Sequence, residues 1–308
     1  MARHLVCLTF DFDALSLWLA RGITSPTPIS QGEFGVVGAA RILDLLDRHA
    51  IAATWFIPGH TLDTYPDLCR RIHAAGHEIA HHGYAHEPPI RLTREEEEAV
   101  LLRGSAAIRR ITGADPRGYR SPAWDVSPHS VELLLAHGFQ YDSSMMGHDS
   151  QPYRARTGDV IALDQPAQFG QATRLIELPV SWSLDDFPHF EYLWTATHLQ
   201  EGLKRADDVL ANWLDDYRYM VQTTDWAVLT YTFHPQVSGR GHRMLMLERL
   251  MGYGVDPTAP PSRRFAWPNR RVPVSRFPAP SRPPASPPQP PPVAADARPS
   301  YARRPATT

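Results

Sequence analysis

The sequence predicts an α/β fold with a mostly parallel sheet, and three observations lead to this prediction. Short β-rich runs alternate with amphipathic helical stretches over residues 5 to 233. The 308 residues, 43% of them hydrophobic, are enough to bury the core of one large enzyme domain. Polar side chains suited to catalysis follow several of the predicted strands, and the carboxyl ends of parallel strands are where α/β enzymes assemble their sites.

Seven extended segments make up the predicted sheet. They cover residues 5–10, 52–57, 78–80, a short piece at Tyr119, and residues 140–143, 175–184 and 226–233. The runs are rich in apolar residues and are bounded by glycine, proline or polar residues, as buried strands are.

Helices are predicted between these strands, over residues 36–49, 66–75 and 195–220. Thr93 with Glu96 forms a capping box for a helix that runs to about residue 111, and the glutamates at 95–98 are expected on its solvated face. Ser127 is predicted to cap a helix through residue 137. Residues 144–173 lack periodicity, so we expect a long excursion that serves as a lid or an interface loop.

Composition divides the chain into a domain at residues 1–255 and a tail at 256–308. The tail carries nine arginines, two aspartates and about half of the 30 prolines, and such a segment buries too little surface to order itself. We therefore expect a disordered tail. The net charge of −2 gives no pull towards nucleic acid, and no run approaches the length of a membrane span. No secretory signal peptide is recognisable and the two cysteines form no spaced framework, so a cytoplasmic location is expected.

Two pairs of residues point to a metal site. Asp11 and Asp13 follow the first strand at i and i+2, so their carboxylates point the same way and need a nearby cation. His82 and His86 are four residues apart, a spacing that permits joint ligation. Two imidazoles and one carboxylate leave an open coordination position, in which a metal activates water for hydrolysis.

These residues occur in five blocks that resemble, in order, the motifs of the NodB-homology polysaccharide deacetylase family. The blocks begin at Thr9, His82, Arg120, Trp182 and Phe233. The resemblance implies a distorted (β/α)7-type barrel and a divalent metal, with zinc favoured over cobalt, nickel or manganese. Glycine at position 83 and phenylalanine between the two aspartates depart from the usual pattern.

By this resemblance each site residue receives a role. The metal ligands are Asp13, His82 and His86, the base is Asp11, and the acid is His234. Arg120 orients the base, and Asp185 orients the acid, with Asp186 as the alternative. The substrate side is formed by Ala123, whose N–H serves the oxyanion, and by Tyr84, Trp124 and Trp182.

The predicted activity is hydrolysis of a carbon–nitrogen amide bond, with an N-acetylated sugar of a polysaccharide or peptidoglycan as substrate. The departures from the motifs resemble a branch that also contains cyclic-imide and allantoinase-like hydrolases, so a cyclic imide or ureide is the alternative substrate. A non-catalytic binding or assembly module is the second alternative. Resemblance to oligomeric members of the branch implies a homo-oligomer.

Overall fold

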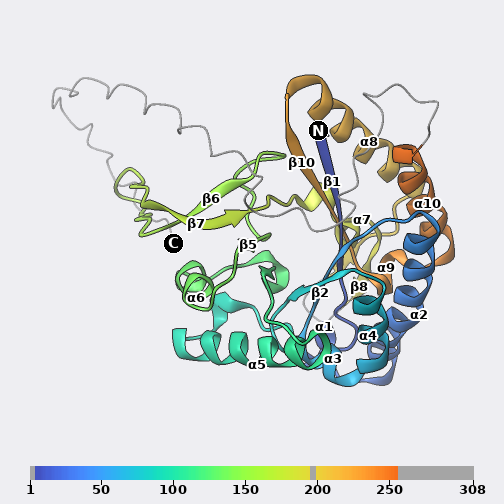
Figure 1. Ribbon diagram of the computed structural model, residues 1–308, viewed down its shortest axis with the longest axis horizontal. Helices are drawn as coiled ribbons and strands as arrows, with labels where there is room; N and C mark the ends of the chain where they lie inside the picture. The colour runs from blue at the N-terminus through green and yellow to red at the C-terminus, as the bar shows by residue number, and fades with distance from the viewer. Residues whose placement is uncertain (1–3, 195–198, 256–308) are drawn as a thin grey trace, which may run out of the picture. The chain divides into compact units, whose positions relative to one another are not determined.

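The computed structural model describes residues 4–194 and 199–255, without the side chains of residues 194, 254 and 255. Within this part of the chain the main sheet has eight strands (Figure 1). Seven are parallel in the order β10-β1-β2-β3-β4-β5-β7, and β6 pairs antiparallel with β7 at one edge. The parallel strands are β1 (His4–Asp11), β2 (Thr54–Ile57), β3 (Glu78–His81), β4 (Gly118–Tyr119), β5 (Tyr141–Asp142), β7 (Gln171–Glu177) and β10 (Ala227–Phe233), and β6 is Tyr153–Thr157.

The sheet curls until its two ends meet. β10 pairs with β1 along its whole length, while the segment that follows β7 reaches β10 from the other side. There Asp185 and Thr232 form an isolated parallel bridge. The predicted α/β fold and seven-stranded (β/α) barrel are confirmed, with this bridge at the seam.

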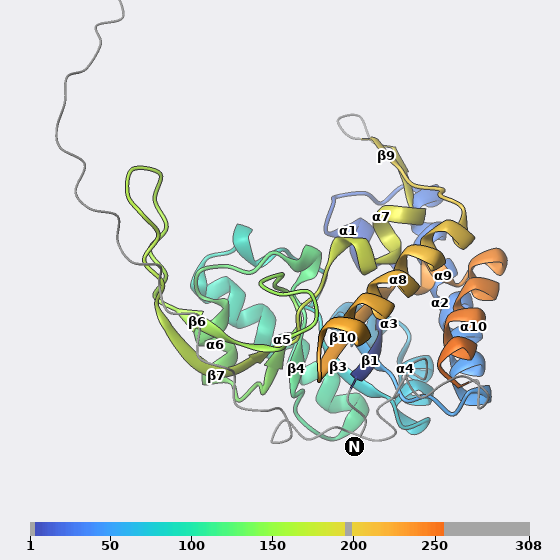
Figure 2. The same ribbon diagram turned by 90° about the horizontal axis from the view of Figure 1, so that it is seen from above.

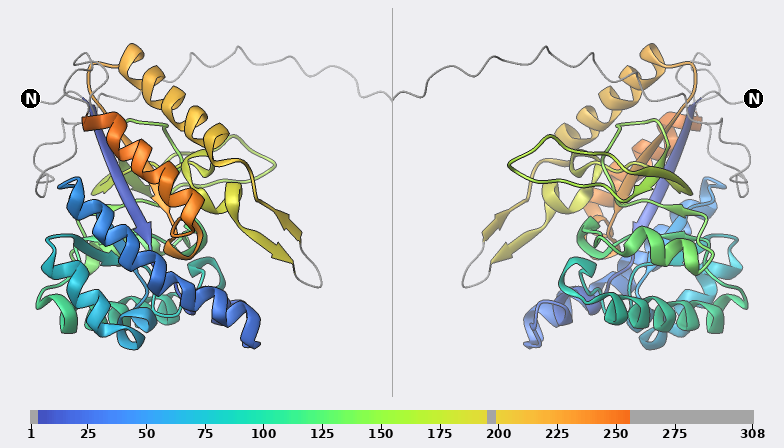
Figure 3. Two further views of the ribbon diagram at one scale, coloured as in Figure 1. Left: turned by 90° about the vertical axis from the view of Figure 1, so that its right-hand side faces the viewer. Right: turned by 90° about the vertical axis from the view of Figure 1, so that its left-hand side faces the viewer.

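Helices connect the parallel strands and cover the outside of the sheet, as the two side views show (Figure 3). Three short helices, α1, α7 and α9, follow the carboxyl ends of β1, β7 and β10. The helices are α1 (Ser16–Leu19), α2 (Pro26–Arg48), α3 (Gly59–Thr64), α4 (Pro66–Ala74), α5 (Arg94–Thr112), α6 (Ser130–Ala136), α7 (Asp186–Phe190), α8 (Ala206–Thr223), α9 (Pro235–Ser238) and α10 (Gly241–Val255).

Alternation along β1 links the core to the site. Leu8 and Phe10 are buried in the main apolar cluster, where the ring of Phe10 stacks on Trp55 with centroids 4.7 Å apart and on Phe233 at 5.5 Å. Successive side chains of a strand point to opposite faces, so Thr9 and Asp11 face the interior of the curl. Truncating an aromatic side chain in such a core to alanine costs about 3–5 kcal/mol.

Several predicted boundaries are confirmed at the level of hydrogen bonds. Thr93 Oγ1 accepts from the N–H of Glu96, and the Glu96 carboxylate accepts from the N–H of Thr93, so the capping box is present. Gly113 ends α5 in the left-handed conformation, with φ of 74°. The predicted strands at 5–10, 78–80 and 226–233 agree with β1, β3 and β10 to within a residue or two.

Two helix starts were predicted wrongly. α2 begins at Pro26 rather than at residue 36, because its first turns carry polar residues that hide the helical period. α6 begins at Ser130, while Ser127 precedes it in a turn and its Oγ accepts from the N–H of His129 at 3.0 Å.

The helix predicted at 195–220 is also wrong in its first part. Leu199–Glu201 is β9, which pairs antiparallel with β8 (Tyr192–Trp194), and the helix α8 starts only at Ala206. Just after β9 the N–H of Gly202 donates to the carbonyl oxygen of Glu191 at 3.0 Å, and the backbones pass so close that a Cβ at Gly202 would lie 2.2 Å from that oxygen. Residues 195–198 lie outside the described part of the chain.

The region predicted as an excursion is largely a β-hairpin. β6 and β7 are joined by residues 158–170, and this connection, which we call the β6–β7 tip, projects away from the barrel (Figure 2). β7 therefore starts at Gln171 and ends at Glu177, short of the predicted residue 184. Trp182–Leu184 forms a 3₁₀ turn instead.

Among the helices of the described residues, none combines the length and apolar character needed to cross a membrane. α10 ends at Val255, the last described residue. The predicted tail, residues 256–308, lies outside the described part, so the domain boundary stays a prediction.

Candidate active site

The chain turns sharply just after β1 and fixes the backbone of Asp13. The Asp13 carbonyl accepts hydrogen bonds from Thr61 Oγ1 and Ser16 Oγ, both at 2.7 Å. The next residue, Ala14, has a φ of 48°, which L-residues adopt only where the surroundings impose it. The carboxylate of Asp13 is thereby aimed at one place.

The carboxylate of Asp13 is buried, and neither oxygen hydrogen-bonds to any group in the described part of the chain. Three imidazoles surround it, with His82 Nε2 at 3.4 Å, His86 Nε2 at 3.8 Å and His234 Nε2 at 3.9 Å from its oxygens. One ligand atom from each of Asp13, His82 and His86 lies within 4.8 Å of the others. A buried anion without a hydrogen bond is costly, and a cation in the centre of this group removes the cost.

The electrostatics of Asp13 and His86 favour the protonation states that metal ligation needs, whereas those of His82 do not. Burial alone would lower the pKa of His82, but the charges of Asp11 and Asp13 raise it. Burial alone would raise the pKa of Asp13, but the imidazoles of His86 and His82 outweigh burial and hold it below its usual range. Burial also lowers the pKa of His86 to about 4, although the charge of Asp13 opposes this. A carboxylate beside a neutral imidazole is the state in which both bind a divalent metal.

Hydrogen bonds to the carbonyl oxygen of Arg120 and to the side chain of Glu87 hold the loop that carries the two histidines. His82 Nδ1 lies 2.7 Å from the carbonyl oxygen of Arg120, so it donates its proton there and leaves Nε2 free to bind. Glu87 accepts from the N–H groups of Tyr84 at 3.0 Å and Ala85 at 2.7 Å. Gly83 has a φ of 71°, and a Cβ there would lie 3.1 Å from Pro122, which explains glycine at this position.

Arg120 fixes the second carboxylate. Its buried guanidinium donates to Asp11 Oδ1 at 2.7 Å and to Thr9 Oγ1 at 2.9 Å. Two further hydrogen bonds of 3.0 Å reach the carbonyl oxygen and Oγ of Ser143, and the ring centroid of Phe56 lies 4.1 Å from the guanidinium carbon. The other oxygen of Asp11 lies 3.9 Å from His82 Nε2. Asp11 is thus held with one oxygen towards the cluster.

His234 follows β10 and is held by two adjacent aspartates. Asp186 accepts from His234 Nδ1 at 2.7 Å and from the backbone N–H of His234, while Asp185 Oδ1 is 3.4 Å from the same Nδ1. Asp185 instead caps α7 by accepting from the N–H of Phe187. The structure therefore corrects the assignment of Asp185, since Asp186 is the residue that orients the imidazole.

The two aspartates also set the charge of the histidine. Burial alone would lower the pKa of His234, but the charge of Asp185 and the hydrogen bond and charge of Asp186 raise it well above 6.5. Burial raises the pKa of Asp185 to about 7, against the pull of His234. The surrounding charges therefore favour the protonated form of His234, whose Nε2 lies 3.9 Å from an oxygen of Asp13.

Two aromatic side chains stack on each other near Arg120, whose guanidinium carbon is 5.9 Å from the ring centroid of Trp124. Trp124 is buried and stacks on Trp182, with ring centroids 4.2 Å apart and planes 24° from parallel, and 45% of Trp182 is exposed. Ala123 and Trp124 have φ values of 54° and 56°, so the backbone beside Arg120 is bent out of the extended path. The predicted Ala123, Trp124 and Trp182 thus lie on neighbouring segments.

Tyr84 does not join them. Its hydroxyl donates to Asp63 at 3.0 Å, and the guanidinium of Arg103 lies 3.4 Å from its ring centroid. These contacts place the side chain against α3 and α5, so the structure gives no support to Tyr84 as a substrate residue.

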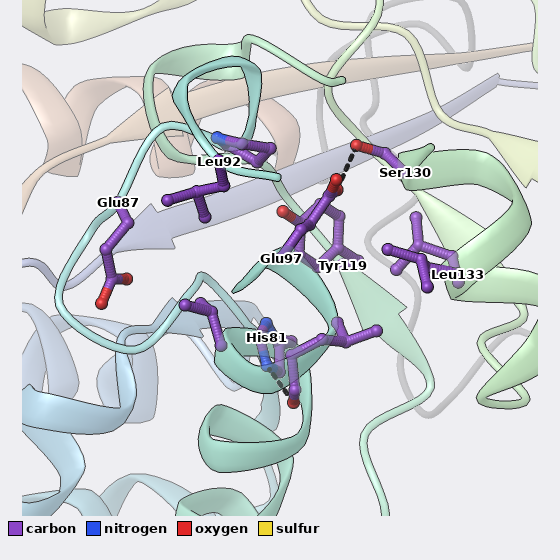
Figure 4. Close-up of a pocket in the computed structure, with 11 residues that line it drawn as sticks. His81, Glu87, Leu92, Glu97, Tyr119, Ser130 and Leu133 are labelled. Atoms are coloured by element: carbon purple, nitrogen blue, oxygen red, sulfur yellow. Dashed lines mark hydrogen bonds between the residues drawn. The ribbon is translucent and has the colours of Figure 1, made fainter. Parts of the chain in front are cut away.

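A cavity of about 10 Å³ lies behind the histidine loop and has room for one water molecule at most (Figure 4). Burial lowers the pKa of His81 to about 3, and His81 Nε2 contacts the carbonyl oxygen of Leu101 at 3.0 Å, so this histidine is a neutral packed residue.

Glu97 is buried and accepts from the hydroxyls of Ser127 and Ser130. The expectation of four solvated glutamates was therefore wrong for Glu97, which ties α5 to the start of α6.

Sequence reasoning missed several supporting residues. Thr9 and Ser143 complete the hydrogen bonds of Arg120, and Thr61 and Ser16 hold the backbone of Asp13. Only Thr9 carried a signal, since it lies two residues before Asp11 and therefore on the same face of the strand.

Comparisons with known proteins decide the family. The sequence profile described as polysaccharide deacetylase matches residues 3–141. The peptidoglycan deacetylase of Helicobacter pylori is 39% identical over 265 residues, which cover 82% of this chain and 90% of that protein. The chain belongs to the polysaccharide deacetylase family. Proteins named deacetylases in this family hydrolyse carbon–nitrogen bonds other than peptide bonds, so the chain is an enzyme of that class.

Further relatives support this membership. A peptidoglycan deacetylase-like protein of Gibberella zeae is 30% identical, over 78% of this polysaccharide deacetylase and 77% of the relative. A solved structure from Mycobacterium smegmatis, assigned to the polysaccharide deacetylases, has a TM-score of 0.70 and 31% identity over 82% of this chain and 83% of that one. A solved allantoinase, Puue, shares the fold with the same TM-score at 21% identity, covering 90% of each chain.

Proposed function

We propose that this polysaccharide deacetylase removes the acetyl group from an N-acetylated amino sugar of a peptidoglycan-type glycan, with the help of a divalent metal. The observation that carries the proposal is the Asp13 carboxylate, which is buried among imidazoles without a hydrogen bond to any described group. This donor set fits a metal, and Asp13, His82 and His86 would hold it. When bound, the metal would polarise the amide carbonyl and the attacking water. One carboxylate and two imidazoles suit zinc, which we favour, as well as cobalt, nickel or manganese.

Asp11 is the proposed base. Arg120 holds one carboxylate oxygen, so the other is free to take a proton from the attacking water.

His234 is the proposed acid. Asp186 orients its ring, and the raised pKa keeps a proton available for the departing nitrogen. The backbone N–H of Ala123 is proposed to stabilise the negative charge on the former carbonyl oxygen, since backbone donors in a bent, rigid segment serve this purpose.

The tryptophan pair supports a sugar substrate. An exposed aromatic face backed by a buried one is a rigid apolar platform, and sugar rings have apolar faces that can pack on it. A small cyclic imide or ureide would need no such extended wall, so it is the alternative that the assay must exclude. The complete set of Asp13, His82, His86, Asp11 and His234 argues against a non-catalytic binding or assembly module.

The test is an assay of the purified full-length chain with each candidate metal in turn. We expect acetate release from N-acetylated glucosamine oligomers and no ring opening of succinimide or hydantoin. Asp11→Asn serves as the inactive control, and Asp67→Asn, which changes an exposed carboxylate of α4, as the active one. Ring opening without acetate release would contradict the proposal.

We also propose that the chain forms a homo-oligomer in the cytoplasm. The β6–β7 tip exposes Ile161, Leu163 and Phe169, with exposed fractions of 68%, 109% and 69%. Clustered apolar side chains on a projecting hairpin are typical of association surfaces.

We expect Leu163→Asp to lower the mass of the assembly in light scattering while the melting temperature stays the same. An unchanged mass, or a monomeric wild type, would contradict this, and cell fractionation tests the location.

A further inference from the structure

Two fully buried carboxyl groups lie at the carboxyl ends of β5 and β7. Asp142 and Glu177 are the last residues of these strands and are partners in their parallel pairing. Within the described residues, no backbone N–H, hydroxyl or basic side chain donates to Asp142 Oδ2 or Glu177 Oε2. Two ionised carboxylates repel each other, and burial makes the repulsion costly. A single proton between the two oxygens removes this cost, and we call the two side chains the carboxyl pair.

The other two oxygens of the carboxyl pair already accept hydrogen bonds. Glu177 Oε1 accepts from the N–H groups of Ser144 at 2.9 Å and Met145 at 2.8 Å, and Asp142 Oδ1 accepts from Ser144 Oγ at 2.6 Å. Burial raises the pKa of both carboxyls. The hydrogen bond between them adds to the rise for Glu177, together with the charge of Asp142, and opposes it for Asp142. Glu177 is thus the protonated member, and its Oε2–H donates to the carboxylate of Asp142.

The neighbouring titratable groups keep their charge states near neutral pH. The guanidinium of Arg120, just after β4, stays charged and lowers the pKa of Asp142. Tyr119 of β4 and Tyr153 of β6 also face the carboxyl pair. Burial raises the pKa of both hydroxyls, and the negative charge of the pair adds to the rise, so they stay neutral. Among these groups, only the carboxyl pair can gain or lose a proton near neutral pH.

The carboxyl pair holds the segment on which Arg120 rests. Ser144 Oγ gives its own proton to the pair and accepts from the N–H of Ser121 at 2.8 Å. The carbonyl oxygen and Oγ of Ser143 accept from the guanidinium of Arg120, both at 3.0 Å. Two residues after Ser121 comes Ala123, in the bent backbone beside the site. Hydrogen bonds therefore lead from the pair to both parts of the segment that starts at Arg120.

We propose that the carboxyl pair shares one proton and thereby positions Arg120 and the backbone of Ala123 for catalysis. This inference rests on the proposed function, in which Arg120 aims Asp11 and the N–H of Ala123 meets the oxyanion. Both members of the pair are positioning residues, because they act through the two serines after β5. Loss of the shared proton leaves two buried negative charges that repel each other, and the serines lose their fixed support.

Three variants separate the hydrogen bonds of the pair from its bulk. Glu177→Ala removes the proton donor and the acceptor of two N–H groups. Glu177→Gln keeps that acceptor and places an amide N–H where the shared proton lies, so it should restore the arrangement. In the double variant Asp142→Asn/Glu177→Gln the shape is kept, but two amide N–H groups meet without an acceptor between them.

The kinetic experiment measures kcat, KM and metal content with N-acetylated glucosamine oligomers. We expect Glu177→Ala and the double variant to lower kcat roughly 10- to 100-fold, since a misplacement of about 1 Å costs up to about 100-fold. KM and metal content should stay close to wild type, and Glu177→Gln should recover most of kcat. Glu132→Gln, which changes an exposed glutamate of α6, is the matched control. A double variant as active as wild type, or a fall in kcat that follows from lost metal, would overturn the inference.

Urea unfolding of the full chain at a series of pH values tests the shared proton without any substrate. The pKa of Glu177 is raised in the folded protein, so the stability that its proton provides is present below the ordinary pKa of 4.5 and is lost as the pH rises towards the raised pKa. Over this range we expect the unfolding equilibrium constant of wild type to rise by up to about tenfold per pH unit relative to that of Glu177→Gln. An equal pH dependence of the two proteins would overturn the shared proton. The expected difference supports the carboxyl pair even if no N-acetylated sugar releases acetate, a result that would overturn the deacetylase proposal alone.

Discussion

Replacing Asp11 by asparagine is expected to lower kcat by roughly two to four orders of magnitude while the metal stays bound. The amide keeps an oxygen for the hydrogen bond from Arg120 Nη1, so the geometry of the site is preserved. It cannot accept the proton of the attacking water, so the base is lost. The check is a steady-state rate together with elemental analysis of the same preparation.

Substitution of a metal ligand should remove the metal, whereas substitution of Asp11 should lower the rate and leave the metal bound. We expect His82→Ala and Asp13→Ala to lose the metal itself, because each removes a group of the three-residue cluster. His81→Ala is the control, since its ring contacts Leu101 and Gly83 rather than the cluster. Wild-type metal content in His82→Ala would show that His82 is not a metal ligand. Wild-type activity in Asp11→Asn would show that Asp11 is not the base.

The second large effect concerns His234 and pH. The imidazolium is the proposed acid and its pKa is raised, so activity should be present below that pKa and lost as the pH rises through it. The basic limb of the rate profile is therefore expected well above pH 6.5. His234→Ala should abolish this limb and lower the rate by roughly two to four orders of magnitude.

Asp186→Asn should move the basic limb to lower pH, because it removes the charge that is hydrogen-bonded to Nδ1. Asp185→Asn should move it by less, since its oxygen is 3.4 Å away. Ser238→Ala is the matched control, because Ser238 donates to Asp186 without contacting the imidazole. A limb that is unshifted in Asp186→Asn would mean that His234 is not the acid.

Much of the barrel could be predicted from local patterns. β1, β3 and β10 are apolar runs with clear ends, and the capping box at Thr93 depends only on two side chains within one turn. The convergence of Asp11, Asp13, His82, His86 and His234 followed from topology, since parallel strands bring their carboxyl ends to one edge. These features need no knowledge of what packs against them.

What the sequence could not show depends on contacts between distant segments. Asp185 and Asp186 are adjacent residues of the same type, so the sequence does not distinguish them. In the structure Asp185 caps α7, and Asp186 accepts the hydrogen bond from His234. The ring of Tyr84 is drawn away by Asp63 and Arg103, which lie on other helices. Nothing in the sequence indicates that Gly202 passes close to Glu191, so the local pattern predicts a helix where β9 lies.

The bridge between Asp185 and Thr232 has a consequence for how the enzyme is made. β1 has β2 on one side and β10 on the other, and β10 is the last strand in the sequence. The sheet is therefore incomplete beside β1 until the far end of the chain is present. Contacts between such distant segments form slowly, because a long loop must close before they can stabilise the fold. The histidine acid and its aspartate partner lie on the two sides of this late closure. Hydrolytic activity should therefore appear only with the final docking event of folding, and a growing chain that ends before β10 carries a complete metal-ligand set but no acid.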